Sequence, residues 1–148
     1  MVLDKSKRPT KADVLPLLRR GAAAVAAARI GLGATALAFP AVPARPWVGA
    51  SADELGAQVF GRALGGRDIA LGLGALAAAG QVSAAPRTTA AWYAAGALSD
   101  ALDTAVTIAA WDRLPRFTRW LIAASAGGAA VAGAAGAVAA LLSEQKPG

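Results

Sequence analysis

The chain has 148 residues, of which 56% are hydrophobic and 5% aromatic, and its formal net charge is +6. It contains no cysteine and no histidine, which excludes disulfides, thiolate chemistry, histidine-ligated haem and the usual zinc sites. Its apolar residues are mostly small and lie in long runs, a pattern typical of closely packed membrane helices. We therefore expect a single all-α membrane domain, an integral bundle of about four transmembrane helices, with no cofactor and no metal.

The positive charge does not indicate a nucleic-acid partner, because the basic residues lie mostly at the edges of the apolar runs. Basic residues at such positions determine membrane topology and face anionic headgroups. The expected partner is the lipid bilayer.

Residues 1–20 form a basic segment that is either an anchor on the inner leaflet or a tail whose charges set the orientation. We favour the tail. Because the first helix usually dominates topology, both termini are predicted to be cytoplasmic in a multi-pass protein of the plasma membrane. The basic residues of this segment are Lys5, Lys7, Arg8, Lys11, Arg19 and Arg20.

The first predicted span covers about 21–42, and Arg29 lies inside it. Val42-Pro43-Ala44 loosely resembles a signal-peptide cleavage site. The presence of Arg29 inside the apolar run, the length of that run and the long basic segment before it argue against a cleaved signal. The prolines that follow this run end the helix.

A short interfacial helix is predicted in the first outer loop. Ser51-Ala52-Asp53-Glu54 is a capping-box pattern that would start a helix, and Gly65-Gly66 would break it. Residues 52–64 would then lie on the membrane surface. A continuous helix from Ala52 to Val82 would run about 46 Å, too long for a span without strong tilt.

The remaining predicted spans cover about 67–82, 89–111 and 120–142, joined by short polar turns. Residues 21–142 thus form the four-helix membrane domain, and 143–148 form a polar tail. Gly61, Gly65 and the glycines of the fourth span are interpreted as helix–helix packing contacts.

Charged residues inside the spans are candidate functional residues, because charge is costly in hydrocarbon. In an antiparallel hairpin of the second and third spans, Arg67 comes level with Asp103, one turn from Asp100. We expect Arg67 to bind Asp103, with Asp100 as second acceptor, and Asp68 to sit at the N-terminus of the second span. Along the membrane normal, the backbone of Arg29 would lie about 5 Å from the level of Asp100. The long arginine side chain can close that gap.

These five residues form the predicted intramembrane polar cluster, with a net charge of −1. One interpretation is an ion-pair clasp that fixes the register of the bundle, and the other is a proton or cation path or a headgroup site. We favour the clasp, because proton traffic needs a carboxylate free of arginine and the charge count leaves only one.

The pattern Arg62-x-x-Gly65-x-Arg67-Asp68-x-x-x-Gly72, followed by Asp100-x-x-Asp103, resembles a family of small bacterial four-helix membrane proteins classed as a domain of unknown function. The likeness covers about residues 20–142. The resemblance implies four spans and a multi-pass location. It offers no activity, so no catalytic residue is carried over.

Three functional classes follow from these features. We expect an accessory or scaffold subunit of a larger membrane assembly, bound to other subunits or to further copies of itself. The alternatives are a small proton-coupled transporter that uses the intramembrane aspartates and a lipid-modifying enzyme with a carboxylate base. The expectation is that the protein is not an enzyme.

Overall fold

A computed structural model describes residues 10–80 and 85–143 of the chain. These residues form five α-helices and two short 3₁₀ turns, and the described ranges contain no strand. The elements are α1 (Lys11–Ala38), α2 (Ala41–Val48), η2 (Gly49–Asp53), α3 (Leu55–Gly80), α4 (Pro86–Ala109), η3 (Trp111–Arg113) and α5 (Arg119–Leu142). The predicted all-α class is confirmed.

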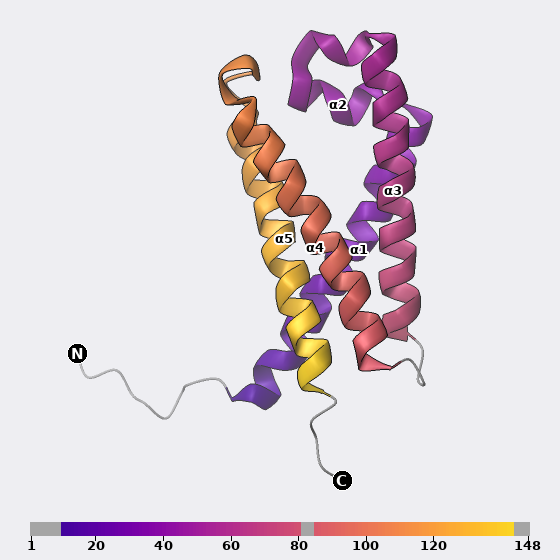
Figure 1. Cartoon of the computed structure of the whole chain (residues 1–148), viewed down its shortest axis with the longest axis vertical. Helices are drawn as coiled ribbons and strands as arrows, with labels where there is room; N and C mark the ends of the chain where they lie inside the picture. The colour runs from indigo at the N-terminus through magenta and orange to yellow at the C-terminus, as the bar shows by residue number, and fades with distance from the viewer. Residues whose placement is uncertain (1–9, 81–84, 144–148) are drawn as a thin grey trace, which may run out of the picture.

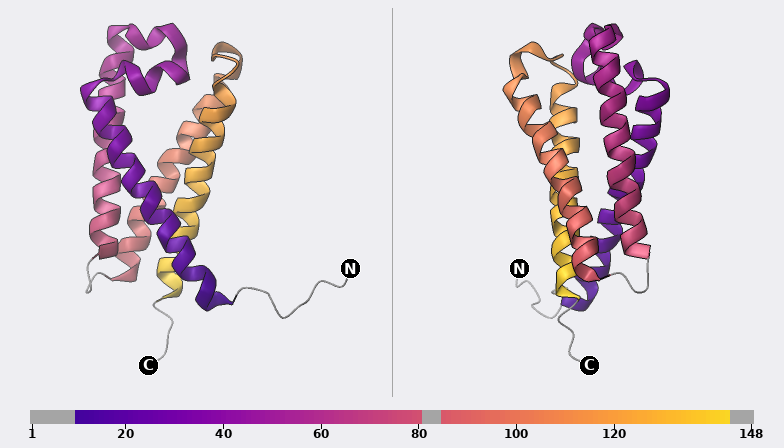
Figure 2. Two further views of the ribbon diagram at one scale, coloured as in Figure 1. Left: turned by 180° about the vertical axis from the view of Figure 1, so that it is seen from behind. Right: turned by 45° about the vertical axis from the view of Figure 1, so that its right-hand side comes forward.

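Four long helices, α1, α3, α4 and α5, run up and down along one axis (Figure 1). α1 begins and α5 ends at one end of the bundle, which we call the terminal end; α3 also ends there and α4 begins there. α2 and the α4–α5 connection lie at the opposite end, the α2 end. α1 packs along α3 and α4 packs along α5, and the two pairs converge toward the terminal end (Figure 2).

Glycines allow the backbones of α1 and α3 to approach closely. A Cβ added to Gly33 would lie 2.5 Å from the carbonyl oxygen of Gly65, and one added to Gly65 would lie 2.7 Å from that of Gly33. Farther along the same contact, a Cβ on Gly72 would lie 2.6 Å from the carbonyl oxygen of Ala26. Each distance is a clash with backbone, so this helix pair requires glycine at these positions.

The second pair uses small residues in the same way, and α5 also crosses α1. Gly133 of α5 faces Tyr93 and Ala97 of α4, while Gly136 of α5 lies against Ala22 of α1. The predicted packing role is therefore confirmed for Gly65, Gly133 and Gly136, whereas Gly128 of the fourth span faces open space. At the α2 end, the Thr118 hydroxyl donates to the carbonyl of Pro46 and ties α2 to the start of α5.

Within the described residues, two helices are long and apolar enough to cross a membrane, by length and composition. They are Asp13–Ala38 of α1 and Arg119–Leu142, which is α5. Only 28% of the most apolar stretch of the first helix is buried, and 11% of that of the second. The core helix of a water-soluble protein would be mostly buried, so these exposed apolar faces are consistent with a membrane protein.

The predicted break at Gly65-Gly66 is wrong, because α3 is one continuous helix of 26 residues. Gly65 is buried against α1, and packing along α1 outweighs the low helix propensity of the two glycines. The first outer loop does contain a short helix, but it is α2 at Ala41–Val48 rather than a separate helix at 52–64. Pro43 lies in the first turn of α2, where a backbone N–H has no intrahelical partner, whereas Pro46 lies inside this short helix.

Candidate functional site: a buried arginine–aspartate network

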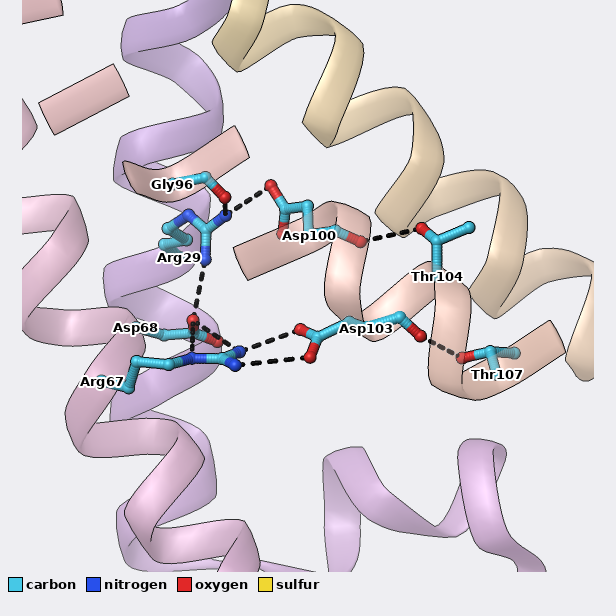
Figure 3. A network of polar contacts seen from close by, with 8 residues as sticks. All are labelled: Arg29, Arg67, Asp68, Gly96, Asp100, Asp103, Thr104 and Thr107. Carbon is cyan, nitrogen blue, oxygen red and sulfur yellow. Dashed lines mark hydrogen bonds and ion pairs between the residues drawn. The ribbon is translucent and has the colours of Figure 1, made fainter. Parts of the chain in front are cut away.

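Arg29 of α1 connects three helices near the middle of the bundle (Figure 3). Its Nη1 donates to Oδ1 of Asp68 in α3 at 2.8 Å. Its Nη2 donates to the backbone carbonyl of Gly96 at 2.8 Å and to Oδ2 of Asp100, both in α4. The side chains of Arg29, Asp68 and Asp100 are only 8%, 12% and 11% exposed. This guanidinium therefore joins α1 to α3 and α4 away from solvent.

Arg67 of α3 extends the network toward the α2 end. Its two terminal nitrogens hold both carboxylate oxygens of Asp103, at 3.3 and 2.9 Å. It also contacts Oδ1 of Asp68, at 3.2 Å from Nη2. A single carboxylate oxygen of Asp68, Oδ1, thus contacts the guanidiniums of both Arg29 and Arg67. The Arg67 side chain is 33% exposed and that of Asp103 20%, so this half of the network is less buried than the half around Arg29.

Helix geometry places the aspartates. Asp100 and Asp103 are three residues apart on α4 and share the face that is turned toward α1 and α3. The hydroxyls of Thr104 and Thr107 donate to the backbone carbonyls of Asp100 and Asp103, at 2.8 and 2.6 Å (Figure 3). These two threonines therefore satisfy local backbone acceptors and leave the carboxylates to the arginines.

The network holds more negative than positive charge. Two guanidiniums face three carboxylates, and each carboxylate accepts at least one hydrogen bond from an arginine. Buried charge is tolerated when it is paired and hydrogen-bonded. Within the described ranges, no group of His, Cys, Asp or Glu could hold a metal ion. The ion pairs can hold α1, α3 and α4 together. The one carboxylate in excess over the guanidiniums is the group able to carry a proton.

A small cavity lies beside the network. It has a volume of about 20 Å³ and touches Arg29, Gly96, Asp100 and Tyr93. A cavity needs about 10–15 Å³ to hold one water molecule. There is thus room for a single water next to Asp100.

The structure brings all five predicted cluster residues into one network. The pair Arg67–Asp103 is confirmed, and so is the reach of Arg29 to Asp100. The assignment of Asp100 as a second acceptor for Arg67 is wrong, because Arg29 takes that position.

The placement of Asp68 at a helix N-terminus is wrong too. α3 starts at Leu55, so Asp68 lies about 20 Å into the helix and pairs with both arginines. Sequence reasoning also missed the Gly96 carbonyl as an acceptor. A backbone oxygen inside a helix leaves no signal in the sequence.

Comparison of the chain with protein-family models, curated proteins and solved structures finds no match. The resemblance to the bacterial four-helix membrane family therefore remains an expectation from the Arg-Asp motif.

Proposed function

We propose that this protein is a multi-pass protein of the plasma membrane in which α1, α3, α4 and α5 each span the bilayer and both termini are cytoplasmic. The four helices have 28, 26, 24 and 24 residues, so the shortest is about 36 Å long, enough for a hydrocarbon core of about 30 Å. The charged residues in the middle of α3 and α4 pair in the interior, and they are Arg67, Asp68, Asp100 and Asp103. Large apolar side chains such as Leu73, Leu98 and Leu102 face outward. That pattern is the one a bilayer requires.

We further propose that it serves as an accessory or scaffold subunit of a larger membrane assembly. The observation that carries this proposal is that every carboxylate of the network is held by a guanidinium. Such a network favours one rigid arrangement of the bundle over movement of an ion, because opening it would strand a buried charge. A rigid bundle with exposed apolar and glycine-containing faces is suited to packing against other membrane helices.

The experiment is purification of the full chain from its own membranes in mild detergent, followed by measurement of the mass of the assembly. The proposal predicts a complex of defined stoichiometry, with another subunit or with further copies of the chain. A monodisperse single chain that moves protons when reconstituted into liposomes would contradict it.

A small proton-coupled transporter is the second candidate. It is favoured by the one carboxylate in excess over the guanidiniums and by the cavity of about 20 Å³ that touches Asp100. In proteoliposomes, a transporter would show proton uptake that Asp100→Asn abolishes while the protein stays folded. If the natural chain shows no proton uptake in proteoliposomes, the protein is not a proton-coupled transporter.

A further inference from the structure

A second, larger cavity lies at the terminal end of the bundle. Its volume is about 380 Å³, and residues from α1, α3, α4 and α5 and from the residue after α5 line it. None of the described lining residues belongs to the arginine–aspartate network. The charged and polar residues of the described lining are Arg19, Arg20, Thr89, Tyr93 and Ser143, and the others are four alanines and Pro86.

The described lining carries positive charge without a compensating acid. Arg19 and Arg20 make no salt bridge with any carboxylate in the described part of the chain, and none of the described lining residues is acidic. α4 begins at Pro86, which also lines the cavity, so the positive end of that helix dipole lies at its edge. Both contributions attract an anion.

The hydroxyl of Tyr93, which lines the cavity, completes the site. Tyr93 is only 5% exposed, and among the described residues its hydroxyl makes no hydrogen bond, although Arg19 acts on it electrostatically. Two other lining hydroxyls already donate to backbone carbonyls, that of Thr89 to Ala78 and that of Ser143 to Ala140. The Tyr93 hydroxyl is therefore the neutral donor left for a ligand. An unpaired phenol hydroxyl at the cavity can donate its hydrogen bond to a ligand or to water.

We propose that this cavity binds a phosphate-bearing anion, through the guanidiniums of Arg19 and Arg20 and the hydroxyl of Tyr93. Guanidinium groups hold phosphate oxygens through paired N–H donors. The phosphate is that of an anionic phospholipid headgroup or a free phosphate group, and the two share this recognition. The alanines that line the rest of the cavity offer an apolar surface to the glycerol and the start of the acyl chains. This site is separate from the network on which the scaffold proposal rests.

The test is binding to the full-length protein in mild detergent, measured by native mass spectrometry. The probes are a short-chain phosphatidylglycerol, a phosphatidylcholine of the same chain length, and inorganic phosphate. We expect phosphatidylglycerol to bind in preference to phosphatidylcholine. Neutralising both arginines, in R19Q/R20Q, should weaken binding about 30-fold, because each arginine near an anionic lipid surface contributes about fivefold.

R113Q/R116Q is the matched control, because it removes the same charge at the α2 end and should leave binding unchanged. Tyr93→Phe keeps the ring and removes only the hydroxyl, and should weaken binding about tenfold. Circular dichroism checks whether each variant is folded. If R19Q/R20Q does not fold, the effect of Tyr93→Phe on binding alone decides whether the proposal stands.

The outcomes separate the two sources of phosphate. Binding of phosphatidylglycerol without binding of inorganic phosphate assigns the site to a lipid headgroup, and binding of inorganic phosphate that displaces the lipid assigns it to a free phosphate group. Equal binding of the two lipids without binding of inorganic phosphate, or binding unchanged in both R19Q/R20Q and Tyr93→Phe, would overturn the proposal.

Discussion

At the scale of single residues, burial determines which arginine contributes most to the free energy of unfolding. Arg29 is 7% exposed and is the partner of Asp100, whereas Arg67 is one-third exposed. Loss of Arg29 strands Asp100 in the interior, while Asp68 keeps Arg67. Loss of Arg67 leaves Asp103 in the less buried half of the network, only six residues from the end of α4 and so closer to the water at the α2 end. The two arginines thus make similar contacts in different dielectric surroundings.

Arg29→Ala is therefore expected to lower the free energy of unfolding by about 3–5 kcal/mol, the usual effect of breaking a buried ion pair. Arg67→Ala should lower it by clearly less. Arg29→Lys keeps the charge but loses the forked contact. Its free energy of unfolding should lie between that of the natural chain and that of Arg29→Ala. The measurement is denaturant-induced unfolding in detergent. A larger loss for Arg67→Ala than for Arg29→Ala would show that burial does not control these energies.

The Arg67–Asp103 pair can be predicted from the sequence, because the two residues lie at the same depth in consecutive antiparallel helices. Depth alone cannot predict how α1 is rotated about its own axis. That rotation, set by the contact of Gly33 with Gly65, is what directs Arg29 between Asp68 and Asp100. The same reasoning explains why Arg67 is not the partner of Asp100.

At the scale of elements, the close contact of α1 and α3 explains why α3 continues through Gly65 and Gly66. The apolar runs in the sequence predict all four long helices, and the predicted fourth span, 120–142, nearly coincides with α5. The start of α3 could not be predicted, because two adjacent glycines read locally as a helix break. In the structure one of them, Gly65, faces a neighbouring backbone, and the other, Gly66, faces open space.

Those two adjacent glycines form a matched pair of test sites. Gly65→Ala should destabilise the protein, because the new methyl group would lie 2.7 Å from the Gly33 carbonyl oxygen. Gly66→Ala meets nothing within 4 Å and should stabilise the helix by about 0.5–1 kcal/mol. Thermal unfolding of both variants in the same detergent checks the prediction. If both alanines stabilise, α1 and α3 do not pack as closely as described.

The outward face of α5 is the surface on which a partner subunit is expected. The sequence places Gly128 and Gly136 on one stripe of α5, but Gly136 packs against Ala22 inside the bundle and only Gly128 faces open space. Gly128→Leu should therefore leave the single chain folded and reduce the size of the purified assembly. Gly66→Leu, at an equally open site on α3, is the control. An assembly unchanged by Gly128→Leu would mean that this face contacts lipid.

At the scale of the whole molecule, the two ends of the bundle should lie on opposite sides of the membrane. The chain has no cysteine, so single cysteines are clean probes. Ser51→Cys at the α2 end should react with an impermeant thiol reagent in intact cells, and Ser143→Cys at the terminal end should react only after the membrane is opened. The reverse pattern would invert the proposed orientation, and equal labelling in intact cells would argue against four spans.

The central claim is that the network is a closed clasp, and a double-mutant cycle on Arg29 and Asp100 tests it most directly. Arg29→Ala should lower the free energy of unfolding because it strands the Asp100 carboxylate, and Asp100→Ala should lower it because Arg29 then keeps only Asp68 and the Gly96 carbonyl. The double variant should recover much of the loss, giving a coupling energy of about 1–3 kcal/mol between the two positions. Losses that simply add would contradict the clasp, as would an Asp100→Asn variant that keeps full stability and abolishes proton uptake in proteoliposomes.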